Sequence, residues 1–254
     1  MKLSKVLKYQ TKLFIGPVLT YFLIIIALYI IGWIPSLFTE NGEQIFRFSG
    51  FDVSGFVFIF VMGLNSFKPS FRFLIGNSIS RKTQFWSTAA SFVILAAFMG
   101  VITTLFSAFF PILSSYSAIF YTLYSLAYPG LTLQTLYTSI PFLFTCFLWT
   151  FTVFLAAIAG GYFLTTLAYR MNKALKLLFF IGVPALFLIV IPIVDTYITG
   201  MTIFSFLGKC IVGGLGLLTP LPSPLIGCAS FVGITAFCLL LAYLCMRRAV
   251  LKEG

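Results

Sequence analysis

Long apolar stretches, separated by short polar or basic connections, make up most of the chain. A helix that crosses a bilayer needs about 20 apolar residues. Six stretches meet or approach that length, and they cover residues 13–34, 53–67, 85–113, 136–168, 177–194 and 225–246. The second stretch is the shortest and must borrow residues from its flanks. The pattern predicts an all-α polytopic membrane protein: one transmembrane domain over residues 1–254 with six transmembrane helices.

The first 12 residues differ from the spans because they are amphipathic. At about 100° per residue, their apolar side chains and Gln10 fall on one side and four lysines fall on the other. The lysines are Lys2, Lys5, Lys8 and Lys12. Such a helix lies in the membrane interface, with its apolar side in lipid and its lysines near anionic headgroups. Residues 1–12 are therefore predicted to form an interfacial helix that contacts membrane lipid. An ordinary basic flank of the first span is the alternative.

Two further segments are irregular. Residues 114–135 are rich in Ser, Thr and Tyr, and we expect an outer loop along the interface, where tyrosine is favoured. Residues 201–224 are apolar but interrupted by glycines and prolines. Within a membrane, a broken segment is tolerated where it is buried in protein or lines a cavity. A broken or re-entrant outer segment is therefore predicted between the fifth and sixth spans.

The charge distribution sets the expected orientation. The chain is 61% hydrophobic and 8% charged, with a net charge of +11. A basic excess can indicate nucleic acid, but membrane proteins also concentrate Lys and Arg on their cytoplasmic side. With six spans and both termini inside, all 16 cations except Arg47 and Lys209 fall on the inner side. We therefore expect cytoplasmic termini and no nucleic-acid partner.

Several kinds of chemistry lack the residues they need. The chain has no histidine, its five acids are scattered, and its five cysteines form no C-x-x-C pair. The usual zinc, haem and copper sites therefore lack ligands. The span interiors carry no ionisable group, so a proton relay is not expected, although sodium held by backbone carbonyls stays open. We expect neither an enzyme nor a cofactor.

The longest basic connection covers residues 68–86. Pro69 suits the first turn of a helix and Gly76 suits the C′ position, which predicts a separate helix of about two turns. One face of that helix then carries an apolar knob that can fill a groove in a partner. The members of the knob are Phe71, Leu74 and Ile75.

The second half of this connection, from residue 76 onward, holds candidate helix caps and two cations. Ser78 or Ser80 is placed to cap the third span. Arg81 and Lys82 are expected at the membrane edge, where they reach headgroups or partner carboxylates, or simply obey the orientation rule. Residues 76–83, GNSISRKT, nearly match a nucleotide-binding P-loop. However, Arg81 replaces the second glycine and no α/β domain surrounds the segment, so no nucleotide site is expected.

This layout resembles the permeases of type 2 ABC exporters in their compact bacterial form. The resemblance rests on residues 1–12, on residues 201–224 and on a coupling loop at 68–84 that ends in a Gly…Ser-Arg-Lys run. Three residues, 77–79, separate the glycine from the serine, where the family often has one. The resemblance implies that the loop holds a cytoplasmic coupling helix that docks an ATPase. The implied docking residues are Phe71, Arg72, Phe73, Leu74, Ile75, Gly76, Ser80, Arg81 and Lys82.

The same resemblance implies the function. The chain would be a permease subunit in a bacterial plasma membrane, paired with an ATP-binding cassette ATPase and with a second permease copy, identical or related. ATP hydrolysis would occur in the separate ATPase subunit. The small size and high Phe content are similar to permeases that export peptides, lantibiotics or phenol-soluble modulins, so we expect an amphipathic or hydrophobic substrate: a peptide, toxin, antibiotic or lipid-like molecule. The alternative is a passive channel, or a membrane scaffold or assembly protein, without an ATPase.

Overall fold

A computed structural model describes residues 3–34, 51–113, 118–128, 139–197, 200–218 and 221–247. In these ranges the regular structure is entirely helical, and six helices are long and apolar enough to cross a membrane, which confirms the six predicted spans. Four of them are α1 (Leu3–Trp33), α2 (Phe51–Gly76), α3 (Arg81–Leu113) and α6 (Ile140–Arg170). The fifth span is Lys173–Tyr197 and the sixth is α11 (Pro224–Arg247). Three shorter elements are α4 (Ile119–Tyr124), η2 (Ser125–Ala127) and α10 (Thr202–Gly214).

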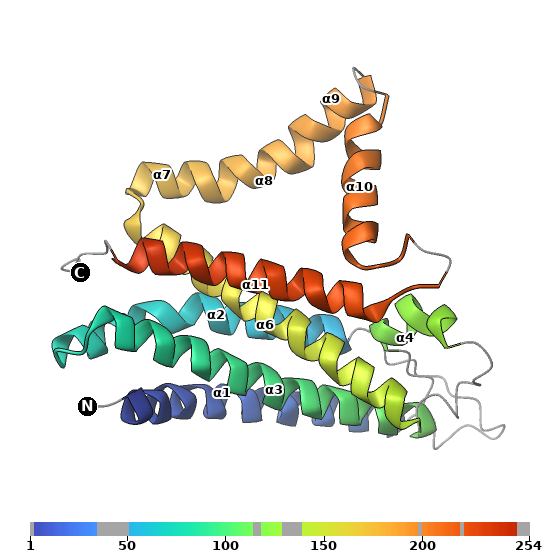
Figure 1. The fold of residues 1–254 in the computed structure, drawn as a ribbon, viewed down its shortest axis with the longest axis horizontal. Helices are drawn as coiled ribbons and strands as arrows, with labels where there is room; N and C mark the ends of the chain where they lie inside the picture. The colour runs from blue at the N-terminus through green and yellow to red at the C-terminus, as the bar shows by residue number, and fades with distance from the viewer. Residues whose placement is uncertain are drawn as a thin grey trace.

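Helix α6 is the centre of the bundle. It packs against α2, α3 and α11, while α1 lies along α3 (Figure 1). Within the most apolar window of each span, 56% of α6 is buried inside the protein, against 0% of Lys173–Tyr197. Figure 1 shows that the fifth span rises away from the bundle and that α10 runs back from its far end toward α11. Five spans therefore form the packed body, and the fifth stands apart.

The contact between α2 and α6 brings two backbones together. A Cβ atom on Gly63 would meet the carbonyl oxygen of Ile158, and one on Gly161 would lie 2.9 Å from the backbone nitrogen of Leu64. The hydroxyl of Thr165 also donates a hydrogen bond of 2.5 Å to the carbonyl oxygen of Leu64. Membrane helices lack a hydrophobic force that drives them together, so they rely on such close packing at small residues.

Tyr162 joins α6 to three neighbours. Its side chain is 1% exposed, and its ring lies 5.3 Å from that of Phe92 on α3 and 5.8 Å from that of Phe67 on α2. The hydroxyl donates to the sulfur of Met246 on α11 at 3.6 Å. The ring thus fills the point where four helices meet, and its hydroxyl has a partner, as a buried polar group requires.

The interfacial helix predicted for residues 1–12 is not a separate element. Helix α1 runs without a break from Leu3 to Trp33. Buried side chains recur every four residues along one face of it, at Val6, Gln10, Phe14, Val18 and Phe22. Because this stripe has the same phase before and after residue 12, the whole helix stays on α3. Val6 and Gln10 therefore face protein rather than lipid. Lys2 lies outside the described residues.

The fifth span has a changing helical pitch. It consists of α7 (Lys173–Leu177), η3 (Leu178–Gly182), α8 (Val183–Ala185), η4 (Leu186–Val190) and α9 (Ile191–Tyr197), of which η3 and η4 are π-helical. Each π segment ends two residues before a proline, at Pro184 and Pro192. A proline removes one backbone donor and its ring clashes with the preceding turn, and a wider turn accommodates both effects.

Asp195 folds the chain back between α9 and α10. Its side chain is 0% exposed, and its two carboxylate oxygens accept the backbone N–H groups of Ile203 and Phe204 at 2.8 Å each. Its carbonyl oxygen also accepts the N–H of Met201 at 2.8 Å. The N–H groups of Ile203 and Phe204 belong to the first turn of α10 and have no partner within the helix. The described part of the segment predicted as broken, residues 201–218 and 221–224, contains the 13-residue helix α10, capped by Asp195, and a turn at Gly216.

The α2–α6 contact yields a first prediction. Replacing Gly161 with Ala places a Cβ against the backbone of α2, and overpacking of this kind costs about 1–3 kcal/mol. We expect a lower thermal unfolding temperature of the purified protein. The matched control is Gly160→Ala on the next residue, where the nearest atom to a new Cβ is a ring carbon of Phe60 at 3.9 Å. Equal unfolding temperatures for the two variants would contradict the close contact.

The Asp195 cap yields a second prediction. Replacing Asp195 with Ala removes both acceptors at the start of α10, and loss of such a cap costs about 0.5–2 kcal/mol. We expect faster hydrogen exchange at the amides of Ile203 and Phe204. The control is Thr196→Ala, because Thr196 is exposed next to Asp195. Unchanged exchange in the Asp195→Ala protein would show that the cap does not hold the helix start.

Candidate functional site

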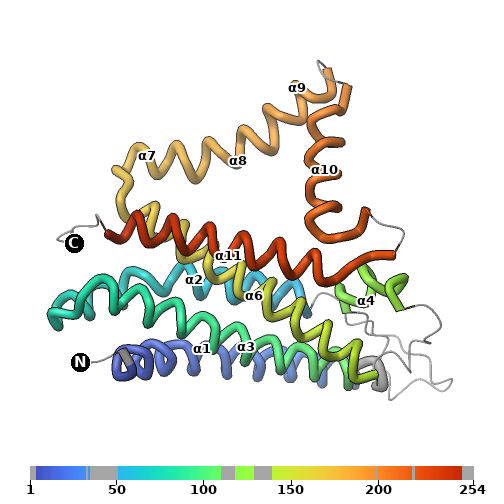
Figure 2. The backbone as a smooth tube through the Cα atoms, viewed as in Figure 1, coloured from blue at the N-terminus to red at the C-terminus, as the bar shows by residue number. Residues whose placement is uncertain are grey.

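One end of the molecule is strongly basic. Helices α1, α3 and α7 begin there, and α2, α6 and α11 end there (Figure 2). Among the described residues, every Lys and Arg except Lys209 on α10 lies near one of these helix ends. All of the basic side chains are exposed: Lys5, Lys8, Lys12, Lys68, Arg72, Arg81, Lys82, Arg170, Lys173, Lys176 and Arg247. The two described acids lie away from this basic end: Asp52 at the start of α2 and Asp195 near the end of α9.

The turn between α2 and α3 is a Schellman motif at this basic end. The N–H of Ile79 donates to the carbonyl oxygen of Leu74 at 3.0 Å, and the N–H of Ser78 donates to that of Ile75 at 2.9 Å. Ser78 has a φ of +55°, the left-handed conformation that this motif requires at C′. The prediction of Gly76 at C′ is therefore wrong, because α2 continues through Gly76 and Ser78 takes the left-handed position.

Ser80 begins α3. Its hydroxyl oxygen accepts the backbone N–H of Thr83 at 3.2 Å, and its carbonyl oxygen accepts the N–H of Gln84 at 3.0 Å. This is the N-cap arrangement, in which the side chain satisfies a donor of the first helical turn. Of the two serines predicted as possible caps, Ser80 is the cap and Ser78 is the turn residue.

The apolar knob predicted at residues 71–75 is wrong. Phe71 and Leu74 are 0% and 1% exposed, and Ile75 is half-buried. The Phe71 ring lies 4.8 Å from that of Phe67 and 5.6 Å from that of Tyr169 on α6. The reason is that Pro69 does not start a new helix but lies inside α2. The helix keeps its phase, so its buried face continues past the proline.

The exposed side chains at the end of α2 are not those of the predicted knob. Arg72 is exposed and Phe73 is 50% exposed. One side of the Phe73 ring stacks on Tyr9 of α1, with centroids 4.6 Å apart and planes 20° apart. Gly76, Ser80 and Lys82 are also exposed. The exposed surface of the turn therefore includes Arg72, Phe73, Gly76, Ser80 and Lys82, whereas Phe71 and Leu74 are buried.

Arg81 has a contact that the sequence did not indicate. Its guanidinium Nη1 donates a hydrogen bond of 2.6 Å to the backbone carbonyl oxygen of Arg247. Carbonyl groups in the last turn of a helix have no partner within the helix and carry partial negative charge, so a guanidinium is favoured there. Arg81 thus caps α11 and ties the start of α3 to the end of the sixth span.

A buried amide holds the start of α1 on α3. Gln10 is 1% exposed, and its amide nitrogen donates to the hydroxyl oxygen of Thr88 at 2.7 Å. Its carbonyl oxygen accepts the hydroxyl of Ser87, also at 2.7 Å. Removing either partner would leave a buried polar group unpaired, which is costly. Gln84, one turn earlier on α3, is equally buried, and its side-chain oxygen has no hydrogen-bond partner among the described residues.

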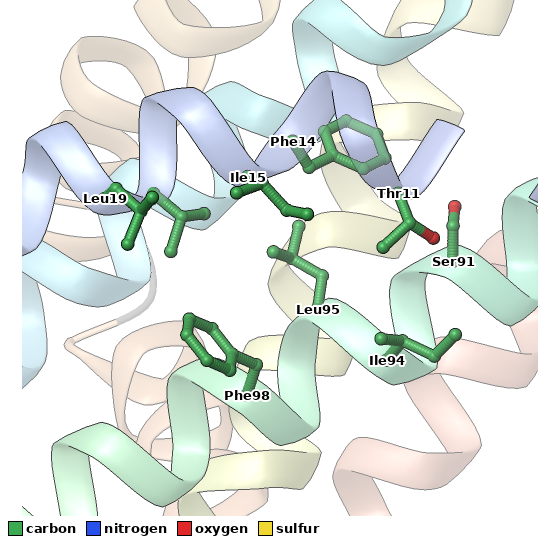
Figure 3. Close-up of a pocket in the computed structure, with 9 residues that line it drawn as sticks. Thr11, Phe14, Ile15, Leu19, Ser91, Ile94, Leu95 and Phe98 are labelled. Carbon is green, nitrogen blue, oxygen red and sulfur yellow. The ribbon is translucent and has the colours of Figure 1, made fainter. Parts of the chain in front are cut away.

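Two hollows flank the start of α1. A cavity of about 720 Å³ lies between this segment and the α2–α3 turn, and Lys5, Tyr9, Phe73 and Ser80 are among its lining residues. On the α1–α3 seam there is an apolar groove of about 280 Å³ (Figure 3). Its only polar side chains are Thr11 and Ser91, at one end of the groove in Figure 3. The cavity at the turn is lined by both polar and apolar side chains, whereas the groove between α1 and α3 is lined almost entirely by apolar side chains.

At the opposite end, α4 closes the bundle. A carboxylate oxygen of Asp52 accepts the N–H of Ile119 at 2.9 Å, and the hydroxyl of Tyr124 donates to the carbonyl oxygen of Leu215 at 2.6 Å. Burial raises the pKa of the Tyr124 hydroxyl, because the charged form is disfavoured away from water. These contacts attach the described part of the predicted outer loop to α2 and to the segment after α10.

The described residues contain no group of three His, Cys, Asp or Glu side chains that could hold a metal ion. All five cysteines are free thiols. No family model, curated protein or solved structure matches the chain. The candidate site therefore rests on its own geometry: an ordered basic turn, tied to α1 through Phe73 and to α11 through Arg81.

The turn yields a third prediction. Replacing Ser78 with Gly relieves a left-handed conformation that costs a non-glycine residue roughly 1–2 kcal/mol. The greater flexibility of unfolded glycine offsets roughly 0.5–1 kcal/mol of that gain. We therefore expect a slightly higher thermal unfolding temperature. The control, Asn77→Gly, should lower it, because it removes the side-chain hydrogen bond of 2.7 Å from Asn77 to the Phe73 carbonyl oxygen. A stabilised Asn77→Gly with a destabilised Ser78→Gly would refute this description of the turn.

Proposed function

We propose that the chain is the transmembrane permease subunit of an ATP-driven exporter in a bacterial plasma membrane. The substrate class in this proposal is an amphipathic or hydrophobic molecule. The basic end faces the cytoplasm, because Lys and Arg accumulate on that side of membrane proteins. A separate ATPase subunit binds the turn between α2 and α3, and ATP hydrolysis in that subunit supplies the energy.

The observation that carries the proposal is the continuation of α2 beyond its apolar part. The helix is one piece from Phe51 to Gly76, and its last turns bear outward-facing Lys68, Arg72 and Phe73. It is packed backbone to backbone on α6 at Gly63. A force applied at the turn would therefore move the helix as a rigid lever rather than bend a loop. A coupling element needs this property.

The expected docking set changes accordingly. Phe71 and Leu74 are part of the internal packing and do not contact a partner in this proposal, and Arg81 is already bonded to Arg247. The docking surface consists of Arg72, Phe73 and Lys82. A half-exposed aromatic ring beside cations is the kind of contact that dominates protein interfaces.

The exposed apolar surface of the fifth span is an argument for a second permease copy in the proposal. No side chain in its most apolar window is buried, and none is buried in α10. A second copy of the chain, or a related permease, covers part of this apolar surface in the proposal. Lipid covers the remainder, since apolar side chains facing lipid are stable in a membrane.

The proposal is tested by tagging the chain, purifying it from its native membrane and asking which ATPase stays bound. We expect an ATPase, with two permease chains in each complex by light scattering. Replacing Arg72 with Glu or Phe73 with Ala should reduce ATPase retention about tenfold or more, the scale of an interface hot spot. The control is Lys176→Glu, which reverses the charge of an exposed cation at the same end but on α7.

Three results would count against the proposal. A stable preparation without any ATPase favours a passive channel or a scaffold. A bound ATPase whose retention is equally insensitive to Arg72→Glu, Phe73→Ala and Lys176→Glu places its contact elsewhere. Loss of retention in the Lys176→Glu protein alone shifts the contact to the fifth span.

A further inference from the structure

The cavity beside the α2–α3 turn has walls of two kinds. Three helix ends enclose it: the start of α1 with Lys5 and Val6, the end of α2 with Phe73, and the start of α3 with Thr83. Its polar walls offer donors, from the Lys5 ammonium and the side chains of Ser80 and Thr83. Its apolar walls include the half-buried side chains of Tyr9 and Ile79. It measures about 720 Å³ and opens onto the protein surface.

The side chains that line the cavity favour an anionic ligand. Lys5 is the only titratable cation among its lining residues, and none of those residues is acidic. The surrounding end of the described molecule is basic throughout, so no nearby described carboxylate competes for Lys5. A phosphate group bound there would accept charge-assisted hydrogen bonds from the ammonium and one bond from the hydroxyl pair of Ser80 and Thr83, whose oxygens share a hydrogen bond of 2.8 Å.

Exposed side chains beside the cavity mark the level at which a membrane interface would lie. Trp86, one turn after Thr83, is 61% exposed, and Leu13, one turn after Tyr9, is 40% exposed. Tryptophan concentrates at the membrane–water interface. The chain therefore passes from exposed cations to exposed hydrocarbon side chains just beside the cavity. A ligand held here has its charged group on the basic side and its apolar part toward the spans.

We propose that this cavity binds the headgroup of an anionic phospholipid, with the phosphate at Lys5 and the Ser80–Thr83 hydroxyl pair and the glycerol and first acyl carbons against Tyr9 and Ile79. The lipid joins the start of α1 to the α2–α3 turn, in addition to the Tyr9–Phe73 ring contact. The amphipathic start of α1 thus recognises a specific lipid through this cavity, although its buried face packs on protein. The inference does not depend on the proposed function, because it involves the chain and lipid alone.

The test uses the purified full chain in phosphatidylcholine nanodiscs with and without phosphatidylglycerol. Lipids retained after release from the nanodisc are counted by native mass spectrometry, and the thermal unfolding temperature is measured in parallel. We expect retention of phosphatidylglycerol in preference to phosphatidylcholine and a higher unfolding temperature with it. Lys5→Glu should reduce phosphatidylglycerol retention by about tenfold or more, the fold-change for losing a hydrogen bond to a charged group.

The controls separate a site from general attraction to the membrane. Lys8→Glu makes the same charge change one turn along α1, at an exposed lysine that does not line the cavity, and should retain phosphatidylglycerol nearly as wild type does. Ile79→Trp fills the cavity without changing charge and should lose retention as Lys5→Glu does. This second variant decides the question if Lys5→Glu fails to fold.

The remaining outcomes overturn the inference. Equal losses in the Lys5→Glu and Lys8→Glu proteins would show a diffuse electrostatic effect with no site. Unchanged retention in the Ile79→Trp protein would place the lipid elsewhere. Displacement of phosphatidylglycerol by inorganic phosphate, with an equal rise in unfolding temperature, would identify a soluble phosphate as the ligand. None of these readouts involves an ATPase, so they leave the proposed function untouched.

Discussion

The close contact between α2 and α6 fixes the arrangement of the other helices. Gly63 and Gly161 let the two backbones touch, and neither helix can rotate or slide without a collision of main-chain atoms. In a membrane this kind of packing replaces the hydrophobic force that drives helices together in water. With α6 held in this way, its other faces receive α3 and α11, and Tyr162 fills the point where the four helices meet.

The same contact decides which face of the basic turn is accessible. Because α2 keeps its phase from Gly63 through Pro69, the buried stripe passes through Phe67 and continues to Phe71 and Leu74. Arg72 and Phe73 are consequently turned outward. The turn is then attached at three points: to α6 through α2, to α1 through Tyr9, and to α11 through Arg81. A displacement of the turn would be passed to all three helices together.

Two surfaces of the protein lack internal partners, and they differ in chemistry. The basic end is rich in exposed Lys and Arg and contains a cavity with a cationic wall. The fifth span and α10 are apolar and bury almost nothing, apart from the Asp195 cap that joins them. Charge on one surface suits an aqueous partner and lipid phosphate, whereas hydrocarbon on the other suits lipid chains or a second apolar chain.

The sequence by itself determined the membrane class, the six spans and the gathering of cations, because hydrophobic length and charge are summed along the chain. It also determined Ser80 as a possible helix cap, since capping is local. Only the tertiary structure decided where Pro69 lies in its helix, which side of residues 71–75 is buried, and that Arg81 binds the end of α11. These depend on the rotation of α2 against α6 and on contacts between residues far apart in the chain. Local patterns do not encode such contacts: a proline that suits a helix start is also tolerated inside a helix whose phase is fixed by its neighbour.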